Sequence, residues 1–410
     1  MQSPFKELPR EISVLVAASF FVAVGFGIVL PAIPVFARTF GVNNAAIGLI
    51  VSMFAITRFA SGLISGKLVD LFGERAVFSS GVFMVALFVF LAGMANSYHQ
   101  LLFFRAAGGL GSSMFSVAAG SVIMRSVDDE HRGRAQSVYN GAFLVGGVSG
   151  PAIGGLLSLI SLRAPFFAYS AMLMVSGIVA HFFLKGEKIG RREKDLDTSE
   201  HTSIREALAM RPYQIALALS FIVNWVVFGM RASIMPVFVT EELHSTTAVV
   251  GYGFALSAIF QGALLMRGGR LSDFRGRRFA SVIGSTVALV GVIFLTLAVH
   301  PWMYLVAMSI IGIGSAYLST TPSSIVGDII RGRGGQVIGT FQMAGDAGMI
   351  VGPLVIGVLS DMYSYRTAFA VSAIVFAFGT LLTTRIPETR ENYLTEKGER
   401  PQINNLRPLD

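Results

Sequence analysis

The sequence predicts an all-α membrane protein with twelve transmembrane helices in two six-helix bundles and both termini in the cytoplasm. Three observations lead to this fold class. Hydrophobic residues make up 53% of the 410 residues and charged residues only 14%, and the mean hydropathy is +0.66; soluble domains carry about 25% charged residues. The apolar residues gather into runs long enough to cross a bilayer. The two halves of the chain also repeat one another.

Twelve apolar runs of membrane-spanning length are separated by polar segments. They lie near residues 12–37, 45–66, 76–95, 100–124, 135–159, 164–185, 213–239, 247–267, 279–299, 302–326, 336–360 and 366–386. The first run is too long for the core of a signal peptide, and Glu7 and Glu11 interrupt the basic flank that such a peptide needs. We therefore interpret it as a helix that is not cleaved.

The distribution of Lys and Arg predicts the orientation, because cytoplasmic loops are enriched in both. With the N-terminus inside, the outer loops hold only Arg38, Arg163 and Arg366. Three more arginines, at 58, 105 and 231, fall within the runs, which leaves 26 of the 32 basic residues in the cytoplasm. These positions also account for the net charge of +8 without a nucleic-acid partner.

A polar stretch at 186–211 divides the runs six and six. Its charge density predicts a flexible linker that could include a short interfacial helix. The expected domains are an N-terminal bundle at 1–185, a C-terminal bundle at 212–386 and a mobile cytoplasmic tail at 387–410.

The two halves match at a nearly constant offset, which indicates duplication. GKLVDLFGER at 66–75 recurs as GRLSDFRGRR at 269–278, and the GxxxGP of 146–151 recurs at 348–353. Gly27 and the Pro-Val-Phe of 34–36 recur 202 positions later. Parallel six-helix repeats enclose a binding cavity between the bundles near the middle of the membrane.

The segment after the second run resembles the signature loop of the major facilitator superfamily. Gly66, Leu68, Asp70 and Gly73 occupy the expected positions, with Glu74-Arg75 where two basic residues are usual. The second copy, from Gly269 to Arg278, fits more closely. The fourth run is similar to the family's arginine motif through Arg105, Gly109 and Gly111, with Gly108 replacing an amide. This resemblance covers the chain outside the linker and tail.

The fifth run resembles a glycine-proline motif associated with exporters of the drug:proton antiporter branch. Its residues are Gly146, Gly150, Pro151, Gly154 and Gly155, and the second copy has Gly348, Gly352 and Pro353. Leu30-Pro31 and Pro34 are similar to a second motif of that branch. We expect these glycines to pack helices closely across the two-bundle interface and gate it, and the prolines to curve the helices. Ordinary glycine packing without a transport role is the alternative.

The resemblance implies that the signature loop acts as a cytoplasmic latch that breaks when the bundles separate. The latch residues are Gly66, Asp70, Gly73 and Arg75, with Gly269, Asp273, Gly276 and Arg278 in the second copy. The glycines permit a tight turn and close helix approach. The partners expected for the first-copy acid are Arg75, Arg132, Arg134, Arg331 and Arg333. A solvated loop without a latching role is the alternative.

Charges inside apolar runs are functional candidates because they are costly in the membrane. Asp346 is the acid nearest the middle of a run, so it is the candidate proton carrier; a fixed ion pair with an arginine is the alternative. The cavity and substrate candidates are Arg58, Arg105, Asn140, Asn224, Arg231, Gln261 and Gln342. For the amides among them, interhelical hydrogen bonds are the alternative.

The motifs together predict a secondary transporter that exports amphiphilic or drug-like molecules in exchange for protons. We expect no enzymatic activity, no metal and no cofactor, with the proton gradient as the energy source. The absence of cysteine excludes disulfides and thiolate metal sites. The expected partners are a small-molecule substrate, protons and the lipid bilayer, and we expect a monomer in the plasma membrane. An exporter or flippase of an anionic metabolite or glycolipid, and a non-transporting sensor or assembly factor, are the alternatives.

Overall fold

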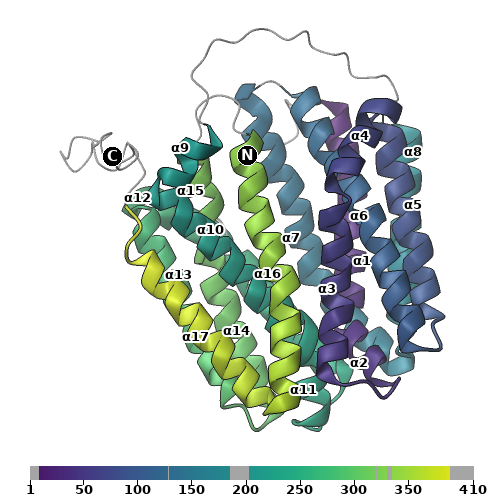
Figure 1. Cartoon of the computed structure of the whole chain (residues 1–410), viewed down its shortest axis with the longest axis vertical. Helices are drawn as coiled ribbons and strands as arrows, with labels where there is room; N and C mark the ends of the chain where they lie inside the picture. Colours follow the sequence, from purple (N-terminus) through teal and green to yellow (C-terminus); the bar gives the residue numbers. More distant parts are fainter. Residues whose placement is uncertain (1–8, 128, 185–202, 319–320, 330–334, 388–410) are drawn as a thin grey trace. The chain divides into compact units, whose positions relative to one another are not determined.

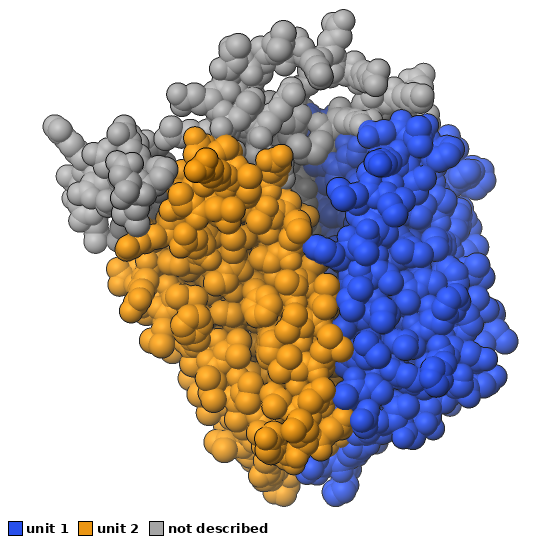
Figure 2. All heavy atoms as spheres, viewed as in Figure 1, with its two compact units in different colours: residues 1–195, 239–255 blue, residues 196–238, 256–410 orange. Residues whose placement is uncertain are grey.

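The computed structural model is helical and has no strand in the residues that it describes, which are 9–127, 129–184, 203–318, 321–329 and 335–387. Contacts divide the chain into two compact units (Figure 2). Unit 1 consists of residues 1–195 and 239–255, and unit 2 of residues 196–238 and 256–410.

The helices of unit 1 follow one another through the first half of the chain (Figure 1). They are α1 (Arg10–Val29), α2 (Ala32–Arg38), α3 (Asn44–Ala60), α4 (Gly62–Phe72), α5 (Glu74–Gly93), α6 (Tyr98–Ser126), α7 (Asp129–Ile160) and α8 (Ala164–Phe183). Helix α1 packs on α7 and α8, and α5 packs on α6 and α8. The core of this unit is therefore made both by consecutive helices and by helices far apart in the sequence.

The second half of the chain begins with α9 (Ile204–Ala209) and α10 (Arg211–Asn224). After it come the π-helix η1 (Trp225–Ile234), α11 (Met235–Glu241), α12 (Thr247–Arg275), α13 (Arg277–Thr296), α14 (Pro301–Leu318), α15 (Thr321–Ile329), α16 (Gly335–Met362) and α17 (Tyr365–Thr383). In unit 2, α16 packs on α10 and η1, while α13 packs on α14 and α17.

Residues 239–255, at the end of α11 and the start of α12, belong to unit 1 by their contacts. Arg38, at the end of α2, forms an ion pair with Glu241 at 2.6 Å between Nε and Oε1. The same guanidinium donates hydrogen bonds to the Val42 carbonyl and to Asn44 Oδ1, at 2.6 and 2.7 Å. These bonds fix the direction of the Arg38 side chain.

Local sequence explains where several helices begin and break. Asn43, Ser97 and Ser364 cap α3, α6 and α17 by accepting hydrogen bonds from backbone N–H groups of the first turn. The turn at Leu30-Pro31 separates α1 from α2, and a 48° bend at Ser61 separates α3 from α4. The prolines of the glycine-proline motifs lie inside α7 and α16 without ending either helix.

In the part of the chain that the structure describes, each apolar run predicted from the sequence corresponds to a helix or a succession of helices. Among the described residues, ten helical segments are long and apolar enough to cross a membrane, or eleven with the bent pair α3–α4. The count of twelve therefore stays a prediction. Of the expected linker and tail, residues 186–202 and 388–410 lie outside the described residues.

The short helix expected in the linker is α9, which is packed against other helices. Ser203 and Glu206 form a capping box at its start, and Ala207 is fully buried in a core shared with α10, α15 and α16. In the same core, the Tyr213 hydroxyl donates to the Val337 carbonyl at 2.7 Å.

Candidate functional site

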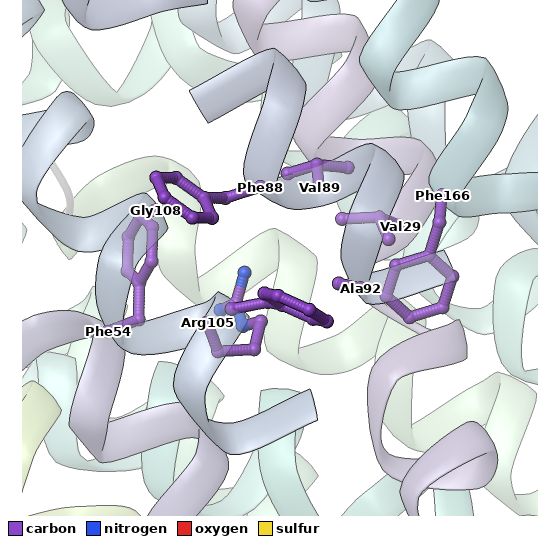
Figure 3. Close-up of a pocket in the computed structure, with 9 residues that line it drawn as sticks. Val29, Phe54, Phe88, Val89, Ala92, Arg105, Gly108 and Phe166 are labelled. Carbon is purple, nitrogen blue, oxygen red and sulfur yellow. The ribbon is translucent and has the colours of Figure 1, made fainter. Parts of the chain in front are cut away.

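Arg105 of α6 points into the interior of unit 1. Only 6% of Arg105 is exposed, and its guanidinium carbon lies 4.5 Å from the centre of the Phe54 ring. The pocket around it, formed by α1, α3, α5, α6 and α8, is lined by Val29, Phe54, Phe88, Val89, Ala92, Phe104, Gly108 and Phe166 (Figure 3). Apart from an electrostatic interaction with Tyr169, Arg105 has no hydrogen bond or ion pair within the described part of the chain.

Arg58 lies one turn after Phe54 on α3, in a different environment. Its side chain is half-buried and interacts electrostatically with Tyr139 of α7. Gly109 of α6 packs closely against this part of α3, because a Cβ atom there would lie 2.5 Å from the Phe54 carbonyl oxygen. The motif glycine thus brings α6 against the helix that carries Arg58.

An apolar groove of about 730 Å³ lies between α1 and α7 in unit 1. Its lining residues are Ser13, Val16, Ala17, Phe20, Phe21, Val138, Gly141 and Ala142. Beside it, the rings of Tyr139 and Phe143 pack with centroids 5.3 Å apart. Asn140 belongs to the same stretch of α7, but its side chain lies outside the described residues. The groove is large and apolar enough to hold a drug-sized molecule.

In unit 2, Asp346 lies near the middle of α16 and is half-buried. Its neighbour Gly345 packs on the end of α10, where an added Cβ would lie 2.9 Å from both Asn224 Nδ2 and Ser220 Oγ. Asn224 Nδ2 donates to the Ser220 carbonyl at 2.9 Å. Gln342, one turn before Asp346, is exposed. The structure therefore brings Asn224 to the helix of Asp346 and leaves Gln342 at the surface of the unit.

Arg231 belongs to η1, a π-helical stretch that the sequence analysis did not predict. The residue is half-buried, interacts with the fully buried Tyr304 of α14, and lines a cavity of about 40 Å³ together with Met230 and Phe376. Gln261 is half-buried on α12 and does not line this cavity. π-Helical turns are frequent at functional sites, which makes η1 an additional candidate element.

The glycine-proline motifs form the same helix crossing in both units. A Cβ added to Gly150 would lie 2.7 Å from the Cα of Gly27, and one added to Gly352 would lie 3.1 Å from the Cα of Gly229. Gly27 and Gly229 are themselves equivalent in the repeat. Backbone approach this close requires glycine.

Most contacts of these motif glycines lie inside one unit, although the sequence analysis placed them across the two-bundle interface. Gly146, Gly150 and Gly154 pack on α1, and Gly348 packs on α10. Gly155 faces Gly251 at the start of α12, which lies in the expected C-terminal bundle at 212–386 although its contacts assign it to unit 1. The gating role of these motifs stays a prediction.

Both signature loops contain the tight turn that their glycines predict. Gly73 has φ 82° between α4 and α5, and Gly276 has φ 94° between α12 and α13. Such angles favour glycine. At Gly66 and Gly269, in contrast, an added Cβ would meet no described atom within 4 Å. Close helix approach at these two glycines stays a prediction.

The predicted latch acids are only partly described. Asp70 is exposed at the end of α4, Arg75 is half-buried and Arg278 is exposed. The side chain of the second latch acid, Asp273, lies outside the described part. The same holds for the side chains of Arg132 and Arg134 and for the whole of Arg331 and Arg333. The latch therefore stays a prediction.

The residues next to the turn glycines make contacts that sequence reasoning missed. Glu74 is 3% exposed and accepts a hydrogen bond from Ser121 Oγ at 3.0 Å. Its repeat equivalent, Arg277, forms an ion pair with Asp328 at 3.2 Å and donates to Ser272 Oγ at 3.0 Å. The charge reversal between the two positions was a visible signal in the sequence. The groove residues Phe20 and Phe21 gave none, because they lie in a uniformly apolar run.

Comparison with known proteins agrees with this architecture. The family model described as Major Facilitator Superfamily matches residues 15–233 and 217–408. Multidrug resistance protein 1 of Bacillus subtilis is 23% identical over 380 residues, 91% of this chain and 95% of that protein. Quinolone resistance protein NorA of Staphylococcus aureus is 22% identical over 366 residues, 86% of this chain and 91% of NorA.

A solved structure shows the same fold. The inward-facing, unoccupied crystal structure of a bacterial homologue of the human lysosomal transporter Spinster superposes with a TM-score of 0.77 at 18% identity, covering 92% of this chain and 97% of that one. Three findings agree on the family of this chain. It has ten or more apolar helices, its helix crossings and turns repeat, and the family model matches nearly the whole chain. The chain belongs to the major facilitator superfamily of multi-pass membrane transporters.

Proposed function

We propose that this protein exports amphiphilic or drug-like molecules in exchange for protons, by alternating access between two six-helix bundles at 1–185 and 212–386. The observation that carries this proposal is the groove between α1 and α7. Its volume of about 730 Å³ falls in the usual range of roughly 300–1,000 Å³ for small-molecule sites. Its almost entirely apolar lining suits substrates recognised by apolar surface.

Two relatives support the choice of substrate class. Multidrug resistance protein 1 and Quinolone resistance protein NorA match this chain over most of their length. At 22–23% identity their substrates are a guide to the class and not to individual compounds. The positive-inside distribution supports both termini in the cytoplasm. Within this proposal the protein has twelve spans and acts as a monomer in the plasma membrane.

Asp346 is the proposed proton carrier. It lies half-buried near the middle of α16, beside the contact of Gly345 with Asn224. Arginine keeps its proton at accessible pH, so Arg58, Arg105 and Arg231 cannot carry out this step. A carboxylate can bind and release a proton as its surroundings change between the two states of a carrier.

Transport by purified protein in proteoliposomes tests the proposal, with ethidium and norfloxacin as substrates and an imposed pH gradient. We expect substrate movement against its concentration gradient, lost when an ionophore collapses the proton gradient. Liposomes without protein control for leakage. Transport that ignores the pH gradient would contradict proton coupling. Absence of ethidium and norfloxacin transport alongside transport of an anionic lipid would favour the flippase.

The groove can be tested separately by filling it. Gly141 lines the groove, and its added Cβ meets nothing within 4 Å, so Gly141→Phe fills the groove without a backbone collision. We expect KM for ethidium to rise about tenfold or more. Gly147→Phe is the matched control, because Gly147 is equally open on α7 but does not line the groove. Equal KM values for the two variants would remove the groove from the substrate path.

A further inference from the structure

The buried guanidinium of Arg105 is not explained by the export mechanism. The residue is 94% buried, since 6% of its surface is exposed, and its Nε has no hydrogen-bond partner. Within the described residues of unit 1, no carboxylate forms an ion pair with it. Its guanidinium carbon lies 4.5 Å from the centre of the Phe54 ring, a cation–π contact.

A cation in this position needs a negative partner. Removing a guanidinium from water costs much more than a single cation–π contact returns. The phenol of Tyr169 is neutral at ordinary pH and so supplies no full charge. Around Arg105, the rings of Phe54, Phe88, Phe104 and Phe166 line the pocket (Figure 3). Aromatic rings carry partial positive charge on their edges, so rings whose edges face the cavity tolerate an anion.

The size of the cavity limits what the partner can be. Its volume of about 10 Å³ is room for roughly one water-sized sphere. A drug or lipid headgroup does not fit there, whereas a monatomic anion does. The larger groove between α1 and α7 has a different lining, so the two sites are distinct.

We propose that the Arg105 pocket binds a single small monovalent anion, chloride, as the buried counter-ion of unit 1. The anion accepts hydrogen bonds from the guanidinium and lies among the phenylalanine rings. This counter-ion stabilises the fold of unit 1. Its test measures stability and requires no transport, so it can fail or succeed separately from the proposed export activity.

The test compares melting temperatures of the purified full-length protein in detergent, in sodium gluconate and sodium chloride at equal ionic strength. We expect chloride to raise the melting temperature saturably, by about 2–4 °C at concentrations well above the dissociation constant. Bromide should act like chloride, and its anomalous scattering in crystals should mark the ion beside Arg105. Equal melting temperatures in both salts, or a bromide peak elsewhere only, would overturn the proposal.

Three variants assign the response to Arg105. Arg105→Met removes the charge, so we expect no chloride response and a stability in gluconate at least equal to that of the wild type. Arg105→Lys keeps the charge and should retain a weaker response, which serves if the methionine variant does not fold. Arg231→Met is the matched control in unit 2, where the guanidinium interacts with Tyr304; it should keep the full chloride response. A full response in Arg105→Met would exclude this site.

Discussion

The two units share their backbone contacts but differ in the charges that they carry. The crossing of Gly27 with Gly150 in unit 1 recurs as Gly229 with Gly352 in unit 2. At the signature turns, by contrast, the buried Glu74 of unit 1 corresponds to Arg277 of unit 2, which pairs with Asp328. Contacts between backbones leave no room for a Cβ, whereas a charged contact can be rebuilt when its partner changes as well.

The repeat shows how such a rebuilding could occur. Asp328 lies 203 positions after Arg125, just as Arg277 lies 203 positions after Glu74. The acid and the base have therefore exchanged places between the two copies. The Arg125 side chain lies outside the described residues, so the pair Glu74–Arg125 is a prediction from this symmetry.

The charges inside the helices differ between the units in the same way. By the repeat, Leu144 occupies in unit 1 the place of Asp346, and Met308 occupies in unit 2 the place of Arg105. Unit 1 therefore buries a cation where unit 2 is apolar, and unit 2 has an acid where unit 1 is apolar. The proposed proton carrier of unit 2 therefore has no acidic counterpart in unit 1.

The largest effect is expected from Asp346→Asn. If Asp346 carries the proton, uphill transport driven by pH is abolished, while downhill substrate exchange survives because the cavity remains. Substrate-induced proton release from purified protein measures the coupling. Asp361→Asn, the same change near the end of α16, is the control and should retain substrate-induced proton release.

A less stable Asp346→Asn protein would indicate that Asp346 belongs to a fixed ion pair. Losing the carboxylate would then strand a buried cation at a cost of about 3–5 kcal/mol, visible as a lower melting temperature. A stable Asp346→Asn protein that still releases protons would remove Asp346 from the mechanism.

The glycine crossings should give the next largest effect. Gly150→Ala places a Cβ 2.5 Å from the Val24 carbonyl oxygen, so we expect a loss of about 1–3 kcal/mol, measured by thermal unfolding. Gly352→Ala should cost less, because its closest neighbours would lie 3.1 Å away. Gly147→Ala faces open space and serves as the control. Equal losses at Gly150 and Gly147 would show that the crossing is not close in solution.

The charge exchange at the signature turns can be repeated by mutation. Arg277→Glu places two acids together, since Arg277 Nε lies 3.2 Å from Asp328 Oδ2, and we expect a loss of about 1 kcal/mol because the pair is partly exposed. Adding Asp328→Arg should restore most of the lost stability, because the two side chains then pair in the reverse order. A double-mutant cycle of melting temperatures measures this. Arg278→Glu, at the exposed neighbouring residue, is the control. A double variant no more stable than Arg277→Glu would refute the exchange.

The smallest effect on stability is expected from Asp70→Asn. Asp70 is exposed at the end of α4, so the variant should fold normally. We expect slower turnover with little change in substrate affinity, because a latch differs between states and does not touch substrate. Asp273→Asn makes the same change in the second copy and shows whether both loops act alike. Unchanged turnover in both variants would favour solvated loops.

Much of the fold was predictable because its signals are local residue types or repeats along the sequence. The tight turns at Gly73 and Gly276 follow from glycine's access to positive φ. The repeat predicted that Gly27 and Gly229 are equivalent, and the structure then showed that each packs on the matching glycine of its motif. Sequence reasoning missed the π-helical turn around Arg231, because the run is apolar on nearly all sides and so has no periodic pattern that an extra residue in a turn could shift.

The sequence by itself determined the membrane-spanning helices, the duplication and the short list of charges buried among apolar residues, since these follow from composition, spacing and the cost of charge in a membrane. Only the tertiary structure decided that Arg105 points into the core of unit 1, that Asn224 packs on Gly345 next to Asp346, and that Phe20 and Phe21 line a groove. A helix that is apolar on all sides has no polar face to show which way a side chain points. Its direction is set by the helices that pack around it, and these are distant in the sequence.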